Sequence, residues 1–260
     1  MKTALSAVLL FFLALTVTEA SAQISDINAA INKAGRQRML SQRMAKAYFQ
    51  IGQKIDVDRS RKVLDSSIST FDRQLVELKA YAPSPDIKDV YLALEKSWLA
   101  YKDVLVGAVP SPENGRKVLL ISEEVLALAQ QGTVLLEKKS GTATGHLVNI
   151  SGRQRMLSQR MAKFYQAASW GIADERSAGN LDRARKDFSD ALQELSSARS
   201  NTSQITDGLF LVKQQWMFFE NALGQKSGAD KRPQLVVATT SERILEEMEG
   251  VVDLYEKLPK

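Results

Sequence analysis

The sequence predicts an all-α protein built from two tandem antiparallel four-helix-bundle modules. Twelve residues, 35–46, recur unchanged as residues 152–163, so the chain of 260 residues reads as two copies of about 115 residues each. Apolar residues recur at three- and four-residue steps over long stretches, which is the period of an amphipathic helix. Sustained alternation of apolar and polar residues, the mark of strands, is missing. Four amphipathic helices joined by short loops in each copy are typical of an up-down bundle.

The first copy contains four such helical stretches, separated by turn residues. Prolines at 83 and 85 separate the second stretch from the third, and a glycine- and proline-rich segment, 107–115, separates the third from the fourth. Asp86 has a side chain suited to cap the third helix. The predicted helices are residues 24–52, 58–80, 86–105 and 116–139.

The second copy repeats this plan. Trp216 lies 118 residues after Trp98, close to the 117-residue offset of the repeated block. The predicted helices are residues 147–171, 180–199, a third that includes 210–219, and 234–258. Residues 140–145 join the copies, either within one long bent helix or as a flexible linker. The predicted organisation is a signal peptide at 1–22, one module at 23–140 and a second at 141–260.

The N-terminus has the pattern of an export signal. A short basic start, Met1-Lys2, precedes an apolar run over residues 4–17 and the small-residue site Ala20-Ser21-Ala22. A retained anchor is the rival reading, but this run is shorter than the ~20 residues that a spanning helix needs. No later segment is expected to be long and apolar enough to span. We therefore predict cleavage after Ala22 and a soluble protein of the bacterial periplasm.

Composition excludes several kinds of site. The chain has no cysteine and one histidine, His146, which leaves no thiolate metal site, no disulfide and no Ser-His-Asp set. No clustered carboxylates offer acid–base chemistry. We expect no enzyme activity, no metal and no cofactor. The net charge of +5 suits anionic partners, although export argues against nucleic acid.

The repeated block carries its charge in two directions around the helix. Arg36 and Arg43, seven residues apart, share one stripe, whereas Arg38 is displaced by roughly 140° from it. Apolar residues cover much of the remaining circumference, so the helix is expected to be contacted on several faces. The block itself contains no carboxylate. Its guanidinium groups could therefore hold an external oxyanion, for which their planar donor fork is suited.

A structural explanation competes with this one. Arginines of bundle helices commonly pair with carboxylates of neighbouring helices, here Glu77, Glu95, Glu123 or Glu124. Gly35 and its repeat either permit a close helix approach or simply start the helix. Unchanged retention in two otherwise diverged copies favours a specific role, because core packing alone tolerates substitutions of similar volume.

The block, with its preceding alanine or serine, resembles the signature of the type IV pili methyl-accepting chemotaxis transducer N-terminal domain, the PilJ-type domain. It is also similar to the periplasmic sensor domain of nitrate/nitrite sensor histidine kinases. The resemblance spans nearly the whole chain after residue 22 and implies antiparallel four-helix bundles. In the kinases it implies nitrate bound between two paired first helices by an arginine of this motif. By this resemblance the anion-binding arginine is matched by Arg43 and Arg160, the second arginine by Arg38 and Arg155, and the glycine by Gly35 and Gly152.

Two functions are therefore expected to compete. The first is a periplasmic sensory protein that binds a nitrate- or nitrite-like anion through Arg43 and Arg160, assisted by Arg36, Arg38, Arg153 and Arg155. The second is a helical interaction or adaptor module without a small ligand, whose repeated helix docks a membrane receptor or pilus-linked partner through Arg36 and Met39. The repeats are expected to pair within the chain or in a homodimer. No flanking membrane helix or signalling module is expected.

Overall fold

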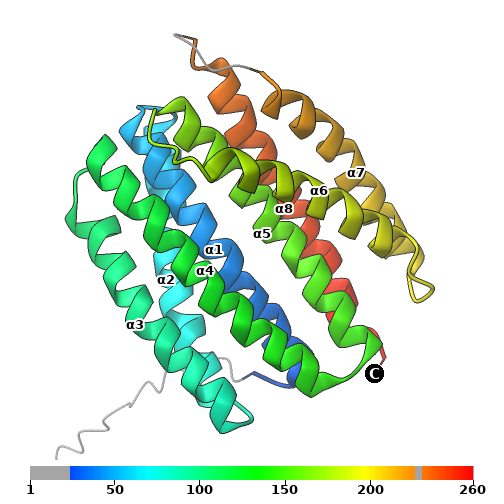
Figure 1. Cartoon of the computed structure of the whole chain (residues 1–260). Coiled ribbons are helices and arrows are strands. Elements are labelled where there is room, and N and C mark those ends of the chain that lie inside the picture. The colour runs from blue at the N-terminus through cyan, green and yellow to red at the C-terminus, as the bar shows by residue number, and fades with distance from the viewer. Residues whose placement is uncertain (1–23, 226–229, 260) are drawn as a thin grey trace, which may run out of the picture.

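The chain folds into antiparallel helices, and no strand is present within residues 24–225 and 230–259, which the computed structural model describes (Figure 1). The predicted all-α class is confirmed. The helices of the first copy are α1 (Ile27–Gly52), α2 (Val57–Tyr81), α3 (Pro85–Gly107) and α4 (Pro112–Ser140). Those of the second copy are α5 (Ala143–Ser169), α6 (Ser177–Ser196), α7 (Ser203–Leu223) and α8 (Arg232–Glu256). The predicted signal peptide lies outside the described residues.

The two copies pack side by side through their first helices. The most extensive helix–helix contact is that between α1 and α5, and α4 and α8 flank this pair (Figure 1). Helices α2 and α3 complete the first bundle, and α6 and α7 complete the second. Gly35 faces Gly152, and farther along Gln53 bonds Gln166, so α1 and α5 run parallel. One continuous apolar core extends through both bundles, and pairing of the repeats within the chain is thus observed.

Local signals explain where the helices begin. The Asp26 side chain accepts hydrogen bonds from the backbone N–H groups of Asn28 and Ala29 at the start of α1. Helices α3, α4 and α8 each carry a proline in their first turn, where its missing N–H costs nothing. The predicted cap of α3 is wrong, because Ser84 holds the N-cap position and Asp86 lies inside the first turn.

The junction between the copies is a tight turn. Gly141 ends α4 in the left-handed region, with φ of 62°, which glycine adopts without penalty. The Thr142 hydroxyl then accepts a hydrogen bond from the Gly145 N–H and caps α5. Both readings of this junction, a long bent helix and a flexible linker, are therefore wrong. Since α4 and α5 turn back on each other, the two first helices end up parallel.

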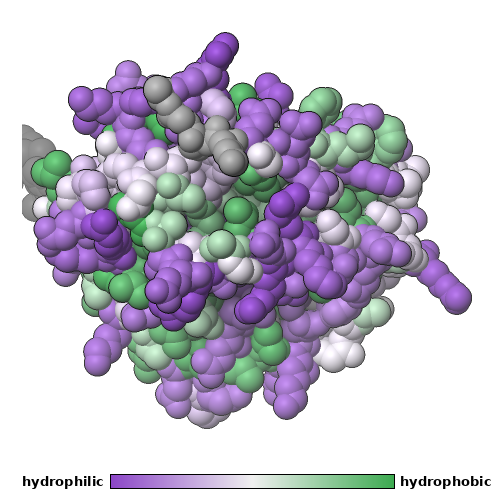
Figure 2. Space-filling model, turned by 45° about the horizontal axis from the view of Figure 1, so that its top comes forward, coloured by the Kyte–Doolittle hydropathy of each residue, from purple (hydrophilic) through white to green (hydrophobic). Residues whose placement is uncertain are grey.

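Helix α4 contradicts the expectation that no segment after the N-terminal run is long and apolar enough to span a membrane. By length and composition it is apolar enough to cross a membrane, the only helix of the described ranges with that property. However, Val118, Val125 and Leu136 of α4 are fully buried in the protein core, and a core helix passes the same test. Packing thus accounts for the apolar residues on the buried face of α4, whereas Leu120 and Val134 of the same helix are exposed. On the face drawn in Figure 2, hydrophilic residues predominate and hydrophobic ones form separate patches among them.

Helices α1 and α5 are enclosed on nearly all sides, as the distribution of their apolar residues predicts. Unusually, the enclosed residues include many polar ones. Gln37, Arg38, Ser41, Gln42 and Lys46 are each at most 1% exposed, as are their counterparts in α5. Buried polar groups require partners. The centre of the molecule is therefore a polar network.

Candidate functional site at the crossing of the repeated helices

Much of the network follows an approximate two-fold symmetry. The Gln37 side chain donates to the Phe71 carbonyl, and Gln154 donates to that of Phe188. Likewise, Gln42 donates to the Ser122 carbonyl at 3.0 Å and Gln159 to the Ser241 carbonyl at 2.9 Å. Two further symmetric bonds cross between the copies: Arg38 Nη2 donates to the Asn149 carbonyl at 3.2 Å, and Arg155 Nη2 donates to the Asn32 carbonyl at 3.3 Å. The two blocks thus contact each other through the same residues, which gives a structural reason for their identity.

The C-terminal end of each block binds a carboxylate of the other module. Arg43 of α1 binds Glu242 of α8 at 2.5 Å, and Arg160 of α5 binds Glu123 of α4 at 2.5 Å. Lys46 also binds Glu242, and Lys163 binds Glu123 at 2.6 Å. The expectation that the block arginines have no carboxylate partner is wrong for Arg43 and Arg160. The structural explanation is confirmed for Glu123, whereas Glu77 and Glu95 pair with lysines outside the block.

We call each of these two ion clusters, Arg43–Lys46–Glu242 and Arg160–Lys163–Glu123, a clamp. Burial and charge set the protonation states of both clamps. Burial lowers the pKa of Lys46 and of Lys163 to about 8, against the attraction of the carboxylates. For Glu242 and Glu123 burial acts upward, but the neighbouring lysine and arginine outweigh it and lower both pKa values to about 2. Near neutral pH each clamp is an ion triad with one carboxylate and two cations.

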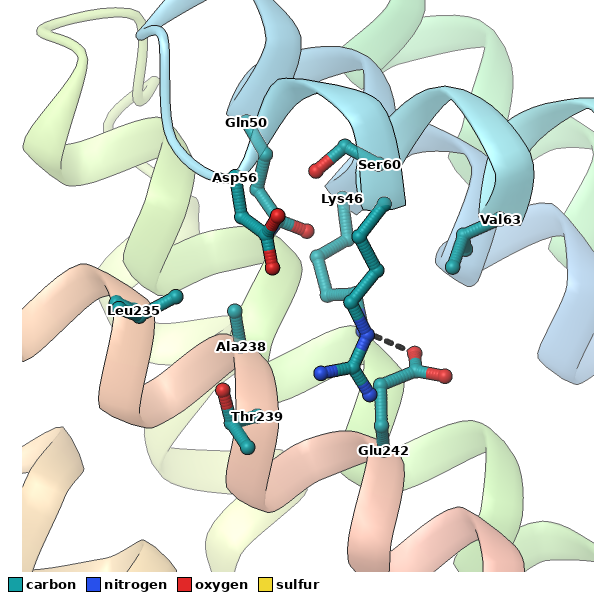
Figure 3. A pocket seen from close by; sticks show the side chains of 10 residues that line it. Lys46, Gln50, Asp56, Ser60, Val63, Leu235, Ala238, Thr239 and Glu242 are labelled. Carbon is teal, nitrogen blue, oxygen red and sulfur yellow. Dashed lines mark hydrogen bonds and ion pairs between the residues drawn. The ribbon is translucent and has the colours of Figure 1, made fainter.

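A small pocket opens beside the first clamp (Figure 3). Lys46 enters it from α1 and meets Glu242 from α8, while Asp56 and Ser60 lie at the start of α2. The pocket is lined by both signs of charge. Its anionic wall, with Glu242 already bound by Lys46, does not favour an anion there.

Two arginines occupy the middle of the crossing. A Cβ atom on Gly35 would lie 3.1 Å from Arg38 Nη2, 3.6 Å from Arg155 Nη2 and 3.9 Å from the Gly152 Cα. A Cβ on Gly152 would lie 3.2 Å from Arg155 Nη2 and 3.6 Å from Arg38 Nη2. Both glycines therefore make room for a pair of guanidinium groups from opposite helices, and the close-approach interpretation of Gly35 is confirmed.

The Arg155 half of this centre contains a carboxylate. Arg155 Nη1 donates to Glu249 of α8 at 2.5 Å, and Nη2 donates to the Asn32 side chain at 2.7 Å. Arg36 binds the same carboxylate, also at 2.5 Å. Burial lowers the pKa of Arg155, and Glu249 acts in the opposite direction.

In the Arg38 half no carboxylate binds the arginine directly, although the nearby charge of Glu137 acts to raise the pKa of Arg38. Arg38 Nη1 donates to the amide oxygen of Gln130 at 2.6 Å, and Nη2 donates to the Asn149 carbonyl at 3.2 Å. Arg38 is fully buried and forms no ion pair with any carboxylate of the described ranges. Burial, followed by the nearby charges of Arg155 and Arg153, lowers the pKa of Arg38 to about 9. Its Nε has no hydrogen-bond partner within that part of the chain.

The structure divides the predicted site residues into two groups. Arg38, Arg155, Gly35 and Gly152 meet at the crossing. Arg43 binds Glu242 and Arg160 binds Glu123, and these two arginines do not face a common opening. The two-stripe prediction is confirmed, because Arg36 and Arg43 both turn to α8 whereas Arg38 points to the centre. Arg153 binds Asp187 of α6 at 2.6 Å.

Sequence reasoning missed the partners on the fourth helices. The sequence prediction assigns no role to Glu242, Glu249 and Gln130 of the fourth helices, nor to Tyr91 of α3, although these residues lie beside the block. One signal was available: the pair Ser122-Glu123 recurs as Ser241-Glu242 in otherwise divergent helices. The same register aligns Gln130 with Glu249. No cluster of three or more His, Asp or Glu residues that could hold a metal is found within residues 24–225 and 230–259.

A comparison with protein families matches two segments of the chain, residues 20–120 and 139–241, to the same family, described as the type IV pili methyl-accepting chemotaxis transducer N-terminal domain. No curated protein and no solved structure matches the chain. The two matched segments cover more than half of the sequence, and each includes the first three helices of one copy and ends within its fourth helix. The chain therefore belongs to the PilJ family and carries its domain twice in tandem.

Proposed function

We propose that this tandem PilJ protein is an exported, periplasmic sensory protein that binds one small oxyanion, of the nitrate or nitrite kind, between α1 and α5. In this proposal Arg38 and Arg155 contact the anion. Arg36 and Arg153 add positive charge at its edge, and Gly35 and Gly152 keep the space open. The protein acts by binding and needs neither a catalytic group nor a cofactor.

The central arginine pair is the observation that carries the proposal. Two fully buried guanidinium groups lie over the same pair of glycines. Like charges repel strongly where water is excluded, and a buried charge without a counter-ion is costly. Among the described residues, Glu249 is the one carboxylate that forms an ion pair with the central arginines, and it pairs with Arg36 and Arg155 but not with Arg38. An oxyanion would supply the missing negative charge and accept bonds from the planar guanidinium forks.

Arg43 and Arg160 have a different role in this proposal. Each already satisfies a carboxylate of the opposite module, so they hold the two bundles together. Their relation to the anion is indirect, through the rigidity of the α1–α5 crossing.

Calorimetric titration of the mature protein with nitrate, nitrite and phosphate in chloride-free buffer tests the proposal. We expect binding of at least one of these anions, and a loss of at least tenfold in affinity in Arg38→Lys and Arg155→Lys, because lysine lacks the planar fork. A surface variant, Arg73→Lys, is the matched control and should bind as the wild type does. Absence of heat with all three anions would refute the anion site.

Two further results decide between the arginine sets and test export. Arg43→Lys and Arg160→Lys should lower stability more than affinity. If they abolish binding in a folded protein and Arg38→Lys does not, the site lies at the clamps instead.

The mass of the protein recovered from the periplasm should correspond to a chain that begins at Gln23.

An interaction module is the second candidate, and the outer helix α7 favours it. Phe210, Met217 and Phe218 of α7 are 60–67% exposed, and Met217 and Phe218 line a groove with Val236 of α8. Met39, which was expected to face a partner, is buried. A receptor fragment captured equally with and without nitrate, and lost in Phe218→Ser, would support this function.

A further inference from the structure

The two halves of the central site differ in the residues that face the arginines, and the difference lies outside the repeated block. In the fourth helices the bond from Gln42 to Ser122 matches that from Gln159 to Ser241. The same register places Gln130 of α4 where α8 has Glu249. Gln130 accepts from Arg38 Nη1 at 2.6 Å, and Glu249 accepts from Arg155 Nη1 at 2.5 Å. The two positions are therefore geometrically equivalent, and one has lost its charge.

The third helices show a matching difference. The stacked pairs Phe71–Trp98 and Phe188–Trp216 align α3 with α7. In this alignment Tyr91 occupies the position in α3 that Leu209 occupies in α7. Tyr91 is 1% exposed, and its hydroxyl has no hydrogen-bond partner among the described residues. The ring lies against Gly132 of α4, where a Cβ would be 3.2 Å from the hydroxyl oxygen. Arg38 is near enough for its charge to oppose the burial that raises the pKa of Tyr91.

Arg153 adds a third observation. Its counterpart, Arg36, binds Glu249 together with Arg155. Arg153 finds no carboxylate at position 130 and binds Asp187 of α6 instead. With an amide at position 130, Arg38 has neutral oxygen partners and no ion-paired carboxylate, in the half that also holds the unpartnered Tyr91 hydroxyl.

From these three differences we infer that the chain has a single anion subsite, on the Arg38 side, where Arg38, the Gln130 amide and the Tyr91 hydroxyl receive the ligand. Glu249 acts as a built-in anion that occupies the equivalent position beside Arg155. The inference rests on the proposed function and specifies which half of the crossing it uses.

The chemistry of displacement supports this assignment. A guanidinium group binds an anionic oxygen more strongly than a neutral amide oxygen, so an oxyanion can replace Gln130 on Arg38. It cannot replace Glu249 on Arg155, because that carboxylate is already charged and is also held by Arg36. Gln130 is partly exposed, so its side chain can turn outward and give an anion a way to the buried Arg38. Glu249 fixes the stoichiometry at one anion per chain.

Two substitutions that exchange the charge test the inference. Gln130→Glu supplies the missing carboxylate, and Gln131→Glu, at an exposed neighbour, introduces the same charge without facing Arg38. We expect wild type and Gln131→Glu to bind one nitrate per chain in calorimetric titration, and Gln130→Glu to lose at least tenfold in affinity. Gln130→Glu should also raise the melting temperature measured without anions, because the new carboxylate neutralises Arg38. Tyr91→Phe should weaken nitrate binding several-fold while keeping the stoichiometry.

The outcomes separate this inference from the proposed function. Two anions per wild-type chain, or undiminished binding by Gln130→Glu, would overturn the single-subsite assignment and leave the anion-binding function standing. A wild type that binds no nitrate, nitrite or phosphate removes the function and the subsite with it. A melting temperature that Gln130→Glu lowers below that of Gln131→Glu would contradict the charge asymmetry independently of any ligand.

Discussion

The ends of the two repeated helices and their crossing have the same sequence but different surroundings. At the ends, Arg43 and Lys46 bind Glu242, and Arg160 and Lys163 bind Glu123, so the two copies are equivalent. At the crossing, Arg155 meets a carboxylate and Arg38 meets an amide. An identical block therefore does not guarantee an identical site, since the partner helices decide the charge balance. The symmetric ends suit assembly, and the asymmetric centre suits recognition.

Removal of a clamp carboxylate should give the largest effect and should be equal for the two copies. Glu242→Gln and Glu123→Gln each leave a buried lysine, Lys46 or Lys163, without its counter-ion. We expect each to lower the free energy of unfolding by about 3 kcal/mol, measured by urea denaturation. Glu95→Gln, which breaks the more exposed pair with Lys79, should cost at most ~0.5 kcal/mol. Unequal costs for the two clamp variants would contradict the equivalence of the ends.

Acid should weaken the two clamps. The neighbouring cations lower the pKa of Glu242 and Glu123 from 4.5 to about 2, against the effect of burial. The folded state therefore binds fewer protons than the unfolded state in this range, and its stability decreases as the pH falls from about 4.5 to about 2. We expect a loss on the order of 1–3 kcal/mol per carboxylate, seen in urea denaturation at stepped pH.

A double variant provides the control for this acid effect. Glu123→Gln/Glu242→Gln has no clamp carboxylate to protonate, so its stability should change less with pH over the same range. Parallel slopes for wild type and double variant would assign the acid sensitivity to other carboxylates.

An added methyl group should destabilise the fold at the α1–α5 crossing but not at an open position of another helix. Gly35→Ala places a methyl group 3.1 Å from Arg38 Nη2, whereas Gly250→Ala in α8 meets no atom within 4 Å. Alanine is the better helix former by about 1 kcal/mol. We expect Gly250→Ala to stabilise the fold by up to that amount and Gly35→Ala to destabilise it by about 1 kcal/mol. Equal stabilisation by both would show that the guanidinium pair adapts freely and that the glycine is not required for space.

The sequence predicts the helices and the two directions of the block because both depend on local periodicity. Arg36 and Arg43 lie seven residues apart, so the helix period places them on one stripe, and both bind α8. Their repeats Arg153 and Arg160 have the same spacing but bind Asp187 of α6 and Glu123 of α4. The identity of the partner helix depends on tertiary pairing, which no local pattern encodes. For this reason the sequence does not predict Glu242 and Gln130 as partners of the block. The turn at Gly141 was also missed, since a glycine within a helical pattern is compatible with several backbone paths.

The smallest effect is expected at the surface between the two copies. His146 of α5 bonds Glu137 of α4 at 2.5 Å and Glu194 of α6 at 2.9 Å. Partial burial lowers its pKa, but the two carboxylates outweigh that and raise it above 6.5. The contribution to stability is thus present below pH 6.5 and is lost as the pH rises through the folded-state pKa. Because His146 is about half exposed, His146→Gln should change the free energy of unfolding at pH 6 by at most ~0.5 kcal/mol. That difference should vanish at pH 9, where the wild-type imidazole is neutral. A nuclear magnetic resonance titration of the single histidine that gives a pKa below 6.5 would contradict the ion pairs and indicate that burial prevails.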